Sequence, residues 1–209
     1  MTSSSSDSRS DRVSVIACGA IARHVDDIAQ RRGWDLDIHP LPPLLHNRPQ
    51  GIAAAVEAEL LALQGVASRV IVAYADCGTY GVLDEVIERH HVERLRGDHC
   101  YDVFAGAAEI AAMLHAQPGT YFFTDYLVKS FHRSVMVELG LDVHPDLRDD
   151  YFGNYTRVVW LAQQPTPELR SAAQAAADVM GLELEEVAVG DLGLEAQLEV
   201  LLQAATPGR

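Results

Sequence analysis

The chain has 209 residues, of which 48% are hydrophobic and 22% charged, and these proportions are typical of a globular protein and exclude disorder throughout. Asp and Glu total 30 against 16 Lys and Arg, for a formal net charge of −14. A surface this negative repels phosphate backbones and anionic headgroups, which argues against binding to nucleic acid or to a membrane surface. We expect one α/β domain over 12–204, preceded by a disordered, Ser-rich tail over 1–11.

The sequence also indicates where the protein works. It has no apolar run that approaches the ~20 residues of a membrane-spanning helix, and its N-terminal segment lacks the apolar core of a secretory signal. Its three cysteines are an odd number, which suits a reducing compartment better than a disulfide framework. We therefore expect a cytoplasmic protein.

Short β-branched runs alternate with longer helical segments along the chain. The predicted strands are 13–17, 35–38, 69–74, 120–123, 157–161 and 182–187, and the predicted helices are 21–31, 52–64, 82–90, 103–115, 126–139, 167–180 and 192–202. This alternation predicts a layered α/β/α architecture with a mostly parallel sheet. Ligands of such sheets bind just beyond the carboxyl ends of the strands, so the turns that follow the strands are the places to look for chemistry.

All three cysteines lie near predicted turns of this kind. Cys18 follows the first strand, Cys77 follows the strand 69–74, and Cys100 precedes the helix 103–115. Helix N-termini favour thiolates, and three thiolates at one edge repel one another unless a cation neutralises them. The cysteines therefore predict a metal site, with Zn²⁺ as first choice and a [4Fe-4S] cluster as the alternative. The competing interpretation of each cysteine alone is a buried residue that fills space.

Other polar side chains lie in the same turns or in the loops beside them. His46, His99 and Asp125 are predicted to transfer protons and orient the substrate, although Asp125 equally suits a helix cap. Asp76 is a lower-ranked ligand or a second cap. The predicted substrate-binding residues are the polar and aromatic ones near these positions: Asn47, Thr79, Tyr80, Tyr126, Asn154 and Tyr155.

Several familiar signatures are missing from the sequence. It contains no G-x-x-x-x-G-K-[ST] phosphate loop and no G-x-S-x-G nucleophile turn. The first strand is followed by Cys18-Gly19-Ala20 rather than by a complete G-x-G-x-x-G loop. Simple ATPase, serine-hydrolase and Rossmann-dehydrogenase interpretations therefore lose support.

A series of short motifs in fixed order resembles a known family. The motifs are 16–20 (IACGA), 45–47 (LHN), 76–79 (DCGT), 99–101 (HCY) with 104–106 (FAG), 124–125 (TD) and 151–155 (YFGNY). Together, over roughly residues 13–165, they resemble the bacterial and archaeal DUF1638 family, which has no established activity. The resemblance implies a loose association with corrinoid-dependent methyl transfer. Its pattern includes His46 and all three cysteines.

These observations lead to three functional hypotheses. The first is a metal-dependent enzyme that acts on a small polar or nitrogen-containing substrate by methyl-transfer, lyase or hydrolase chemistry. The second is a metal-independent, racemase-like enzyme in which Cys18 and Cys77 form a proton-transferring pair. The third is a non-catalytic accessory or metal-binding protein of a corrinoid methyltransferase system. The expected partner is a small-molecule substrate, and the Ala/Leu-rich helices are compatible with a homo-oligomer.

Overall fold

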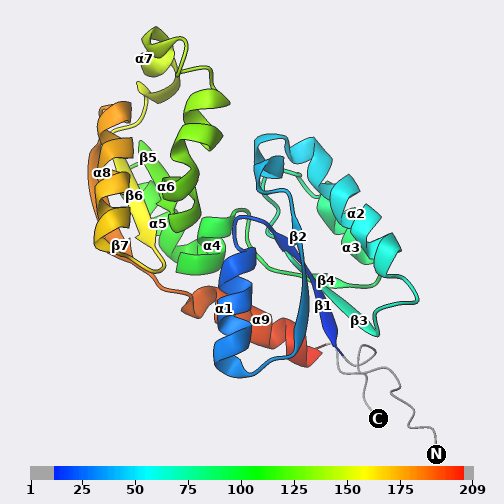
Figure 1. The fold of residues 1–209 in the computed structure, drawn as a ribbon. Helices are drawn as coiled ribbons and strands as arrows, with labels where there is room; N and C mark the ends of the chain where they lie inside the picture. Colours follow the sequence, from blue (N-terminus) through cyan, green and yellow to red (C-terminus); the bar gives the residue numbers. More distant parts are fainter. Residues whose placement is uncertain (1–11, 205–209) are drawn as a thin grey trace, which may run out of the picture. The chain divides into compact units, whose positions relative to one another are not determined.

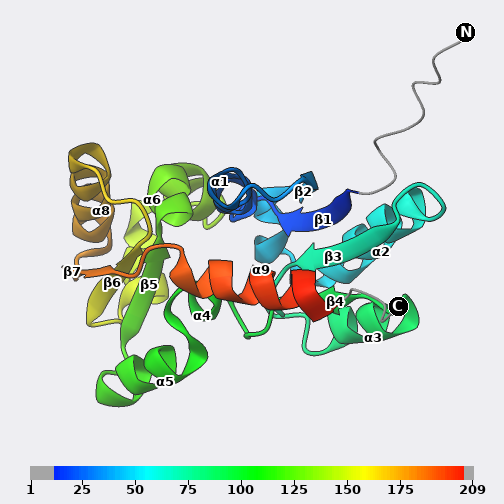
Figure 2. The same ribbon diagram turned by 90° about the horizontal axis from the view of Figure 1, so that it is seen from below.

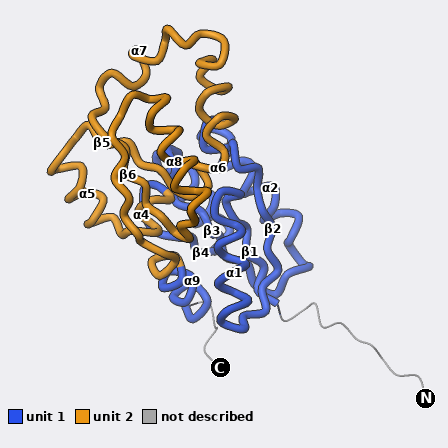
Figure 3. The backbone as a smooth tube through the Cα atoms, turned by 60° about the vertical axis from the view of Figure 1, so that its left-hand side comes forward, with its two compact units in different colours: residues 1–99, 195–209 blue, residues 100–194 orange. Residues whose placement is uncertain are grey.

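The computed structural model describes residues 12–204, so the predicted disordered tail over 1–11 lies outside the described residues. Within the described part, the chain divides into two compact units (Figure 3). Unit 1 comprises the chain up to His99 together with the chain from Glu195 onward, and unit 2 comprises Cys100–Leu194. The single domain expected over 12–204 stays a prediction.

Unit 1 is built on a four-stranded parallel sheet with the strand order β2-β1-β3-β4 (Figures 1 and 2). Its strands are β1 (Val13–Cys18), β2 (Leu36–Leu41), β3 (Arg69–Ala73) and β4 (Glu93–Arg94). Its helices are α1 (Ala22–Arg32), α2 (Ile52–Leu63), α3 (Val82–Arg89), the short 3-10 helices η1 (Pro43–Asn47) and η2 (Pro49–Gly51), and the part of α9 (Leu192–Ala204) from Glu195 onward.

The order in which strands are added to this sheet reverses at β1, because β2 lies on one side of β1 and β3 on the other. Right-handed crossovers then place α1 and α2 on opposite faces. β1 is covered on both faces, and Val15 and Ile16 are fully buried, as expected for a central parallel strand. On the face of α1, ion pairs from Arg31 and Arg32 to Glu195 and Glu199 join α1 to α9.

Unit 2 contains a three-stranded parallel sheet with the order β5-β6-β7. Its strands are β5 (Thr120–Thr124), β6 (Arg157–Ala162) and β7 (Glu183–Ala188). Its helices are α4 (Cys100–Ala105), α5 (Ala107–Ala116), α6 (Asp125–Phe131), α7 (Arg148–Phe152) and α8 (Pro167–Met180), with the π-helical turn η3 (His132–Val137) and the 3-10 turn η4 (Pro145–Leu147).

The middle strand of this sheet, β6, supplies both halves of the core of unit 2. Val158 and Trp160 pack with residues of α6 and α8, whereas Val159 and Leu161 pack with Ile110 of α5. Successive side chains of a strand point to opposite faces of the sheet. Both faces of β6 are therefore buried, which explains why its sequence is a continuous apolar run.

The structure confirms the α/β class with parallel strands and interleaved helices, and it distributes the strands over two sheets. It adds β4, which is only two residues long. The helix predicted over 103–115 is divided at Gly106, whose φ of 89° interrupts it. Among the described residues, no helix is both long and apolar enough to cross a membrane.

Candidate functional site

The site in unit 1 lies where the topology of the sheet reverses. In an open parallel sheet, the crossovers on either side of the reversal point leave a crevice beyond the carboxyl ends of the two strands concerned. Here those strands are β1 and β3. Cys18 is the last residue of β1, and Cys77 follows β3 by four residues, so both cysteines are placed at this edge, as the sequence predicts.

Cys18 is a buried thiol, with only 4% of its surface exposed. Burial raises its pKa, and hydrogen bonds from the backbone N–H of Ala20, from Tyr74 and from the backbone N–H of Ile21 lower it only in part. The helix N-terminus that was expected to favour a thiolate is present, but desolvation has the larger effect. Cys18 by itself is therefore a protonated thiol at neutral pH.

Asp76 organises the loop that carries Cys77. Its carboxylate accepts hydrogen bonds from the backbone N–H groups of Gly78, Tyr80 and Gly81, each at 3.1 Å, and from the Thr79 hydroxyl at 2.5 Å. Burial alone would raise the pKa of Asp76, but these bonds outweigh it and lower the pKa. Asp76 is therefore a charged anchor of this loop, and Thr79, a predicted substrate ligand, is buried against it.

The same loop holds side-chain-bearing residues in an unfavourable backbone conformation. Cys77 has a φ of 51° and Tyr80 a φ of 52°, in the left-handed region that costs a non-glycine residue roughly 1–2 kcal/mol. Hydrogen bonds fix the loop there: the N–H of Cys77 donates to the carbonyl of Asp98 at 2.6 Å, and the N–H of Asp76 donates to that of Gly97 at 3.0 Å. Cys77 is half-buried, whereas Tyr80 is 95% exposed.

The end of β2 and the loop between β2 and α2 pack closely against both cysteine-bearing turns. A Cβ atom on Gly19 would lie 2.4 Å from the carbonyl oxygen of Leu41, and a Cβ atom on Gly78 would lie 3.3 Å from the ring of Pro49. These glycines therefore allow the loop to approach Cys18 and Cys77 from one side. The loop carries two predicted site residues, His46 and Asn47, within η1.

His46 is partly buried in this loop, and Asn47 is exposed. Burial lowers the pKa of His46, although a hydrogen bond with the backbone of Pro43 acts in the opposite direction. The imidazole is therefore neutral at neutral pH, a state in which it can accept a proton.

Arg94 is a site residue that the sequence did not single out. Its guanidinium donates two hydrogen bonds to the carboxylate of Asp84, at 2.6 and 2.9 Å. The hydrogen bond to Asp84 is the main reason why the pKa of Arg94 is raised, and the charges of Asp76 and Cys77 add to the effect. The guanidinium thus lies within electrostatic reach of the Cys77 sulfur, and its positive charge favours the thiolate form of a neighbouring cysteine.

The predicted metal ligands are divided between the two units. Cys18 and Cys77 belong to unit 1, whereas Cys100 is the first residue of unit 2. His99, predicted to transfer protons, is exposed and belongs to unit 1. Across residues 12–204, no group of three or more His, Cys, Asp or Glu side chains is arranged so that it could hold a metal ion. The three-cysteine site for Zn²⁺ or a [4Fe-4S] cluster stays a prediction.

Asp125, a predicted catalytic residue, is fully buried at the carboxyl edge of the sheet of unit 2. Its carboxylate accepts hydrogen bonds from Nε1 of Trp160 at 2.9 Å and from the backbone N–H groups of Gln163 and Gln164 at 3.1 and 2.8 Å. Thr124, rather than Asp125, caps α6 with its side chain. These contacts give Asp125 a structural function, and its predicted role in proton transfer stays a prediction.

The remaining candidates of unit 2 are not gathered around Asp125. Asn154 and Tyr155 precede β6 and so lie at the amino edge of the sheet, opposite the edge at which Asp125 follows β5. The ring of Tyr155 packs against that of Tyr121, with the ring centroids 5.1 Å apart. Tyr126, in α6, accepts a hydrogen bond from Arg133 at its phenol oxygen. Their predicted role in substrate binding stays a prediction.

Because the thiol of Cys18 is buried, we expect the stability of the fold to decrease at alkaline pH. Below pH 9.0, the ordinary pKa of this thiol, it is protonated in the folded and the unfolded chain. Above that pH the unfolded chain loses the proton first, so we expect the free energy of unfolding to fall by up to about 1.4 kcal/mol per pH unit. Urea unfolding measured between pH 8 and 10 tests this sign, and Cys18→Ala is expected to remove this part of the slope. An equal slope in both proteins would contradict it.

Comparisons with known proteins give one match. The sequence model of the family described as "Protein of unknown function (DUF1638)" matches residues 40–198, a span that includes His46, Cys77 and Cys100. No curated protein matches the chain, and no solved structure does.

Proposed function

The chain belongs to the DUF1638 family, and from the arrangement at the carboxyl edge of unit 1 we propose that it is an enzyme that uses the thiol of Cys77 as a nucleophile toward a small polar molecule. The proposal depends on one observation above all: Cys77 occupies a positive-φ position in the turn that leads from β3 into α3. It assigns the reaction class and leaves the identity of the substrate open.

The conformation of Cys77 supports this assignment because a positive φ costs a cysteine free energy, and the hydrogen bonds of the loop hold it there. Strained residues of this kind cluster at active sites. In enzymes with a nucleophile turn, the reacting side chain is held on a sharp connection between a strand and a helix, where it projects above the sheet. Cys77 follows the buried strand β3 in the same way, and Gly78 and Gly81 provide the tight turn around it.

The charges around the two cysteines suggest different roles for them. Arg94 favours the thiolate of Cys77, which attacks an electrophilic carbon of the substrate. The bond from this carbon to a leaving oxygen or nitrogen then breaks, and its electron pair stays on the leaving atom. Cys18 is kept protonated by burial, which suits a proton donor to that atom better than a second nucleophile. Water then attacks the carbon bound to sulfur, the carbon–sulfur bond breaks, and Cys77 leaves as the thiolate. The neutral His46 on the neighbouring loop is the group proposed to take a proton from this water.

Alkylation with iodoacetamide near neutral pH, quantified for each cysteine by peptide mass spectrometry, tests the reactivity on which the proposal depends. We expect Cys77 to react at least ~10-fold faster than the thiol of glutathione and Cys18 to react more slowly than glutathione, because the reaction follows thiolate character and access. Arg94→Gln is expected to slow alkylation of Cys77 several-fold. Arg89→Gln, which removes an exposed ion pair with Glu57, is the matched control.

The alkylation rate of Cys77 can also contradict the proposal. A Cys77 that reacts no faster than glutathione, in protein whose folding is verified by circular dichroism, would overturn it. The same measurement with and without one equivalent of Zn²⁺ addresses the metal hypothesis. Stoichiometric zinc binding that protects Cys18, Cys77 and Cys100 together would favour the predicted metal centre over free-thiol chemistry.

A further inference from the structure

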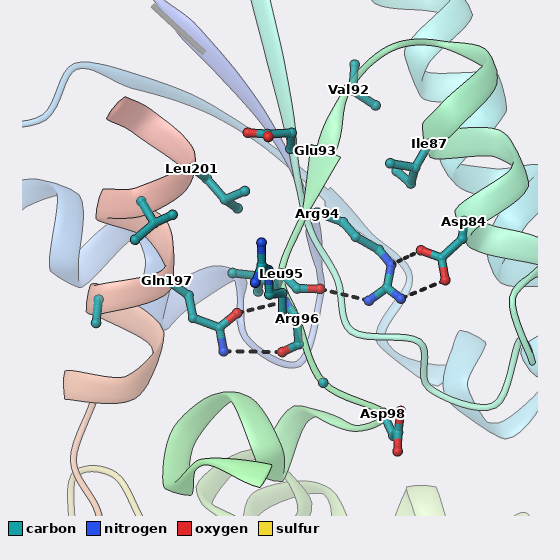
Figure 4. A pocket seen from close by; sticks show the side chains of 13 residues that line it. Asp84, Ile87, Val92, Glu93, Arg94, Leu95, Arg96, Asp98, Gln197 and Leu201 are labelled. Carbon is teal, nitrogen blue, oxygen red and sulfur yellow. Dashed lines mark hydrogen bonds and ion pairs between the residues drawn. The ribbon is translucent and has the colours of Figure 1, made fainter. Parts of the chain in front are cut away.

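A concave region of unit 1 that none of the three cysteines lines lies between the edge strand β4 and α9 (Figure 4). Its volume is about 630 Å³, within the usual range for small-molecule sites. The residues that line it come from α3, from the chain around β4 and from the Ala196–Leu201 part of α9. All of these segments belong to the same unit.

One part of the pocket wall is apolar. Leu95 and Leu201 are buried beneath it, whereas Val200 on α9 is 59% exposed although it lines the pocket. Val92, next to β4, is also in the wall. An exposed valine costs free energy that burial against a ligand would recover, at roughly 25 cal/mol per Å² of apolar surface. This wall therefore suits a short aliphatic group.

The charged residues of the pocket differ in how they are neutralised. Arg94 points toward α3, where Asp84 binds it with two hydrogen bonds (Figure 4). Gln197 holds the backbone of Arg96: the N–H donates to the glutamine oxygen at 2.7 Å, and the carbonyl accepts from the glutamine nitrogen at 3.2 Å. The side-chain amide of Gln197 thus pairs with both backbone groups of Arg96, as the backbone of a neighbouring β-strand would. This pairing fixes the position from which the Arg96 side chain extends.

Two opposite charges of the pocket, Arg96 and Glu93, are not held in a hydrogen-bonded pair of the kind that joins Arg94 to Asp84. Within residues 12–204, neither the guanidinium of Arg96 nor the carboxylate of Glu93 makes a side-chain hydrogen bond or a close ion pair, although Arg69 of β3 interacts electrostatically with Glu93. Both side chains lie on the side of the strand that faces α9 (Figure 4). A ligand with only a carboxylate would be attracted by Arg96 and repelled by Glu93, and a ligand with only an ammonium group would meet the reverse.

We propose that this pocket binds a small zwitterion with an aliphatic side chain, that is, an aliphatic α-amino acid. Its carboxylate would bind the guanidinium of Arg96 and its ammonium group the carboxylate of Glu93, with the side chain on the wall of Val92 and Val200. The proposal does not depend on the reactivity of Cys77. The two sites adjoin, because Gly97 and Asp98, which line the pocket, accept the backbone hydrogen bonds of the Cys77 loop.

Titration of the full chain with three matched probes tests the charge pattern, with ¹H–¹⁵N chemical shifts as readout. The probes are L-leucine, 4-methylpentanoate, which lacks the amino group, and 3-methylbutylamine, which lacks the carboxylate. We expect saturable shifts at the lining residues with leucine and at least ~10-fold weaker binding of the other two, because each loses one charge-assisted contact. Binding of either single-charge probe as tightly as leucine would overturn the zwitterion assignment.

Variants of the two anchors complete the test. Arg96→Gln and Glu93→Gln are each expected to weaken leucine binding at least ~10-fold. Arg23→Gln and Glu88→Gln remove exposed charges of the same sign outside the pocket and are expected to leave binding unchanged. No saturable shift with leucine in the unmodified chain, or equal losses in the anchor and control variants, would refute the site. Cys77→Ser is expected to bind leucine normally, which separates this inference from the proposed function.

Discussion

Replacing Asp125 with alanine is expected to lower the free energy of unfolding by about 3–5 kcal/mol, since it leaves several buried donors without an acceptor. The carboxylate is fully buried and accepts hydrogen bonds from Trp160, Gln163 and Gln164. It thereby joins the end of β5 to the turn that follows β6. Urea unfolding followed by tryptophan fluorescence and by circular dichroism measures the loss.

Two further variants separate the buried network from a general effect of charge. Asp125→Asn keeps the shape but replaces one acceptor oxygen with a donor, so we expect a loss between that of the alanine variant and zero. Asp142→Ala removes an exposed carboxylate and is expected to change stability by less than about 0.5 kcal/mol. A loss below about 1 kcal/mol in Asp125→Ala would show that the three donors find other partners, and it would leave a role in proton transfer as the better explanation of this residue.

The sequence predicts the strands and the edge at which the cysteines lie because both depend on local patterns. Apolar β-branched runs mark β1 and β3, and a parallel sheet places whatever follows them at one edge. β4 has only two residues, Glu93 and Arg94, and such a segment has no periodicity to detect. The division into two sheets depends on which strands pair, and pairing is a property of the folded chain.

The protonation states and contacts of the candidate site are harder to predict from the sequence. They depend on how burial and hydrogen bonds offset each other in the folded chain. Cys18 has the N-terminal position that favours a thiolate, yet burial reverses the outcome. Asp125 is recognisable as a polar residue at a strand end, but its partners lie 35 to 39 residues further along the chain. In the sequence, Arg94 is typical of a solvated charge in a short segment. Only the fold brings it within electrostatic reach of Cys77.

The glycines of the site illustrate the same limit. A glycine after a strand is typical of any tight turn, and Gly19 and Gly78 fit that description. What distinguishes them is the approach of the end of β2 and the loop that follows it, where the Leu41 carbonyl and the Pro49 ring occupy the space that a Cβ would need. Such contacts join segments that are 22 to 29 residues apart in the chain, so no local motif reports them.

Asp76→Ala is expected to impair both the stability of unit 1 and the reactivity of Cys77. The substitution removes the acceptor of three backbone N–H groups and of the Thr79 hydroxyl, and we expect the free energy of unfolding to fall by about 2–4 kcal/mol. Because these bonds hold Cys77 at positive φ, we also expect its alkylation rate to fall several-fold under conditions where the variant remains folded. Chemical unfolding and peptide mass spectrometry measure the two effects on the same protein.

Glu85→Ala supplies the control for a simple effect of charge at the start of α3, because Glu85 lies in the first turn of that helix and is exposed. Its loss is expected to cost about 0.3–1 kcal/mol through the helix dipole and to leave the alkylation rate unchanged. If Asp76→Ala lost stability but Cys77 kept its full rate, the strained loop would serve the fold alone. The reactivity of the thiol would then depend on Arg94, whose Asp84-anchored charge persists without Asp76.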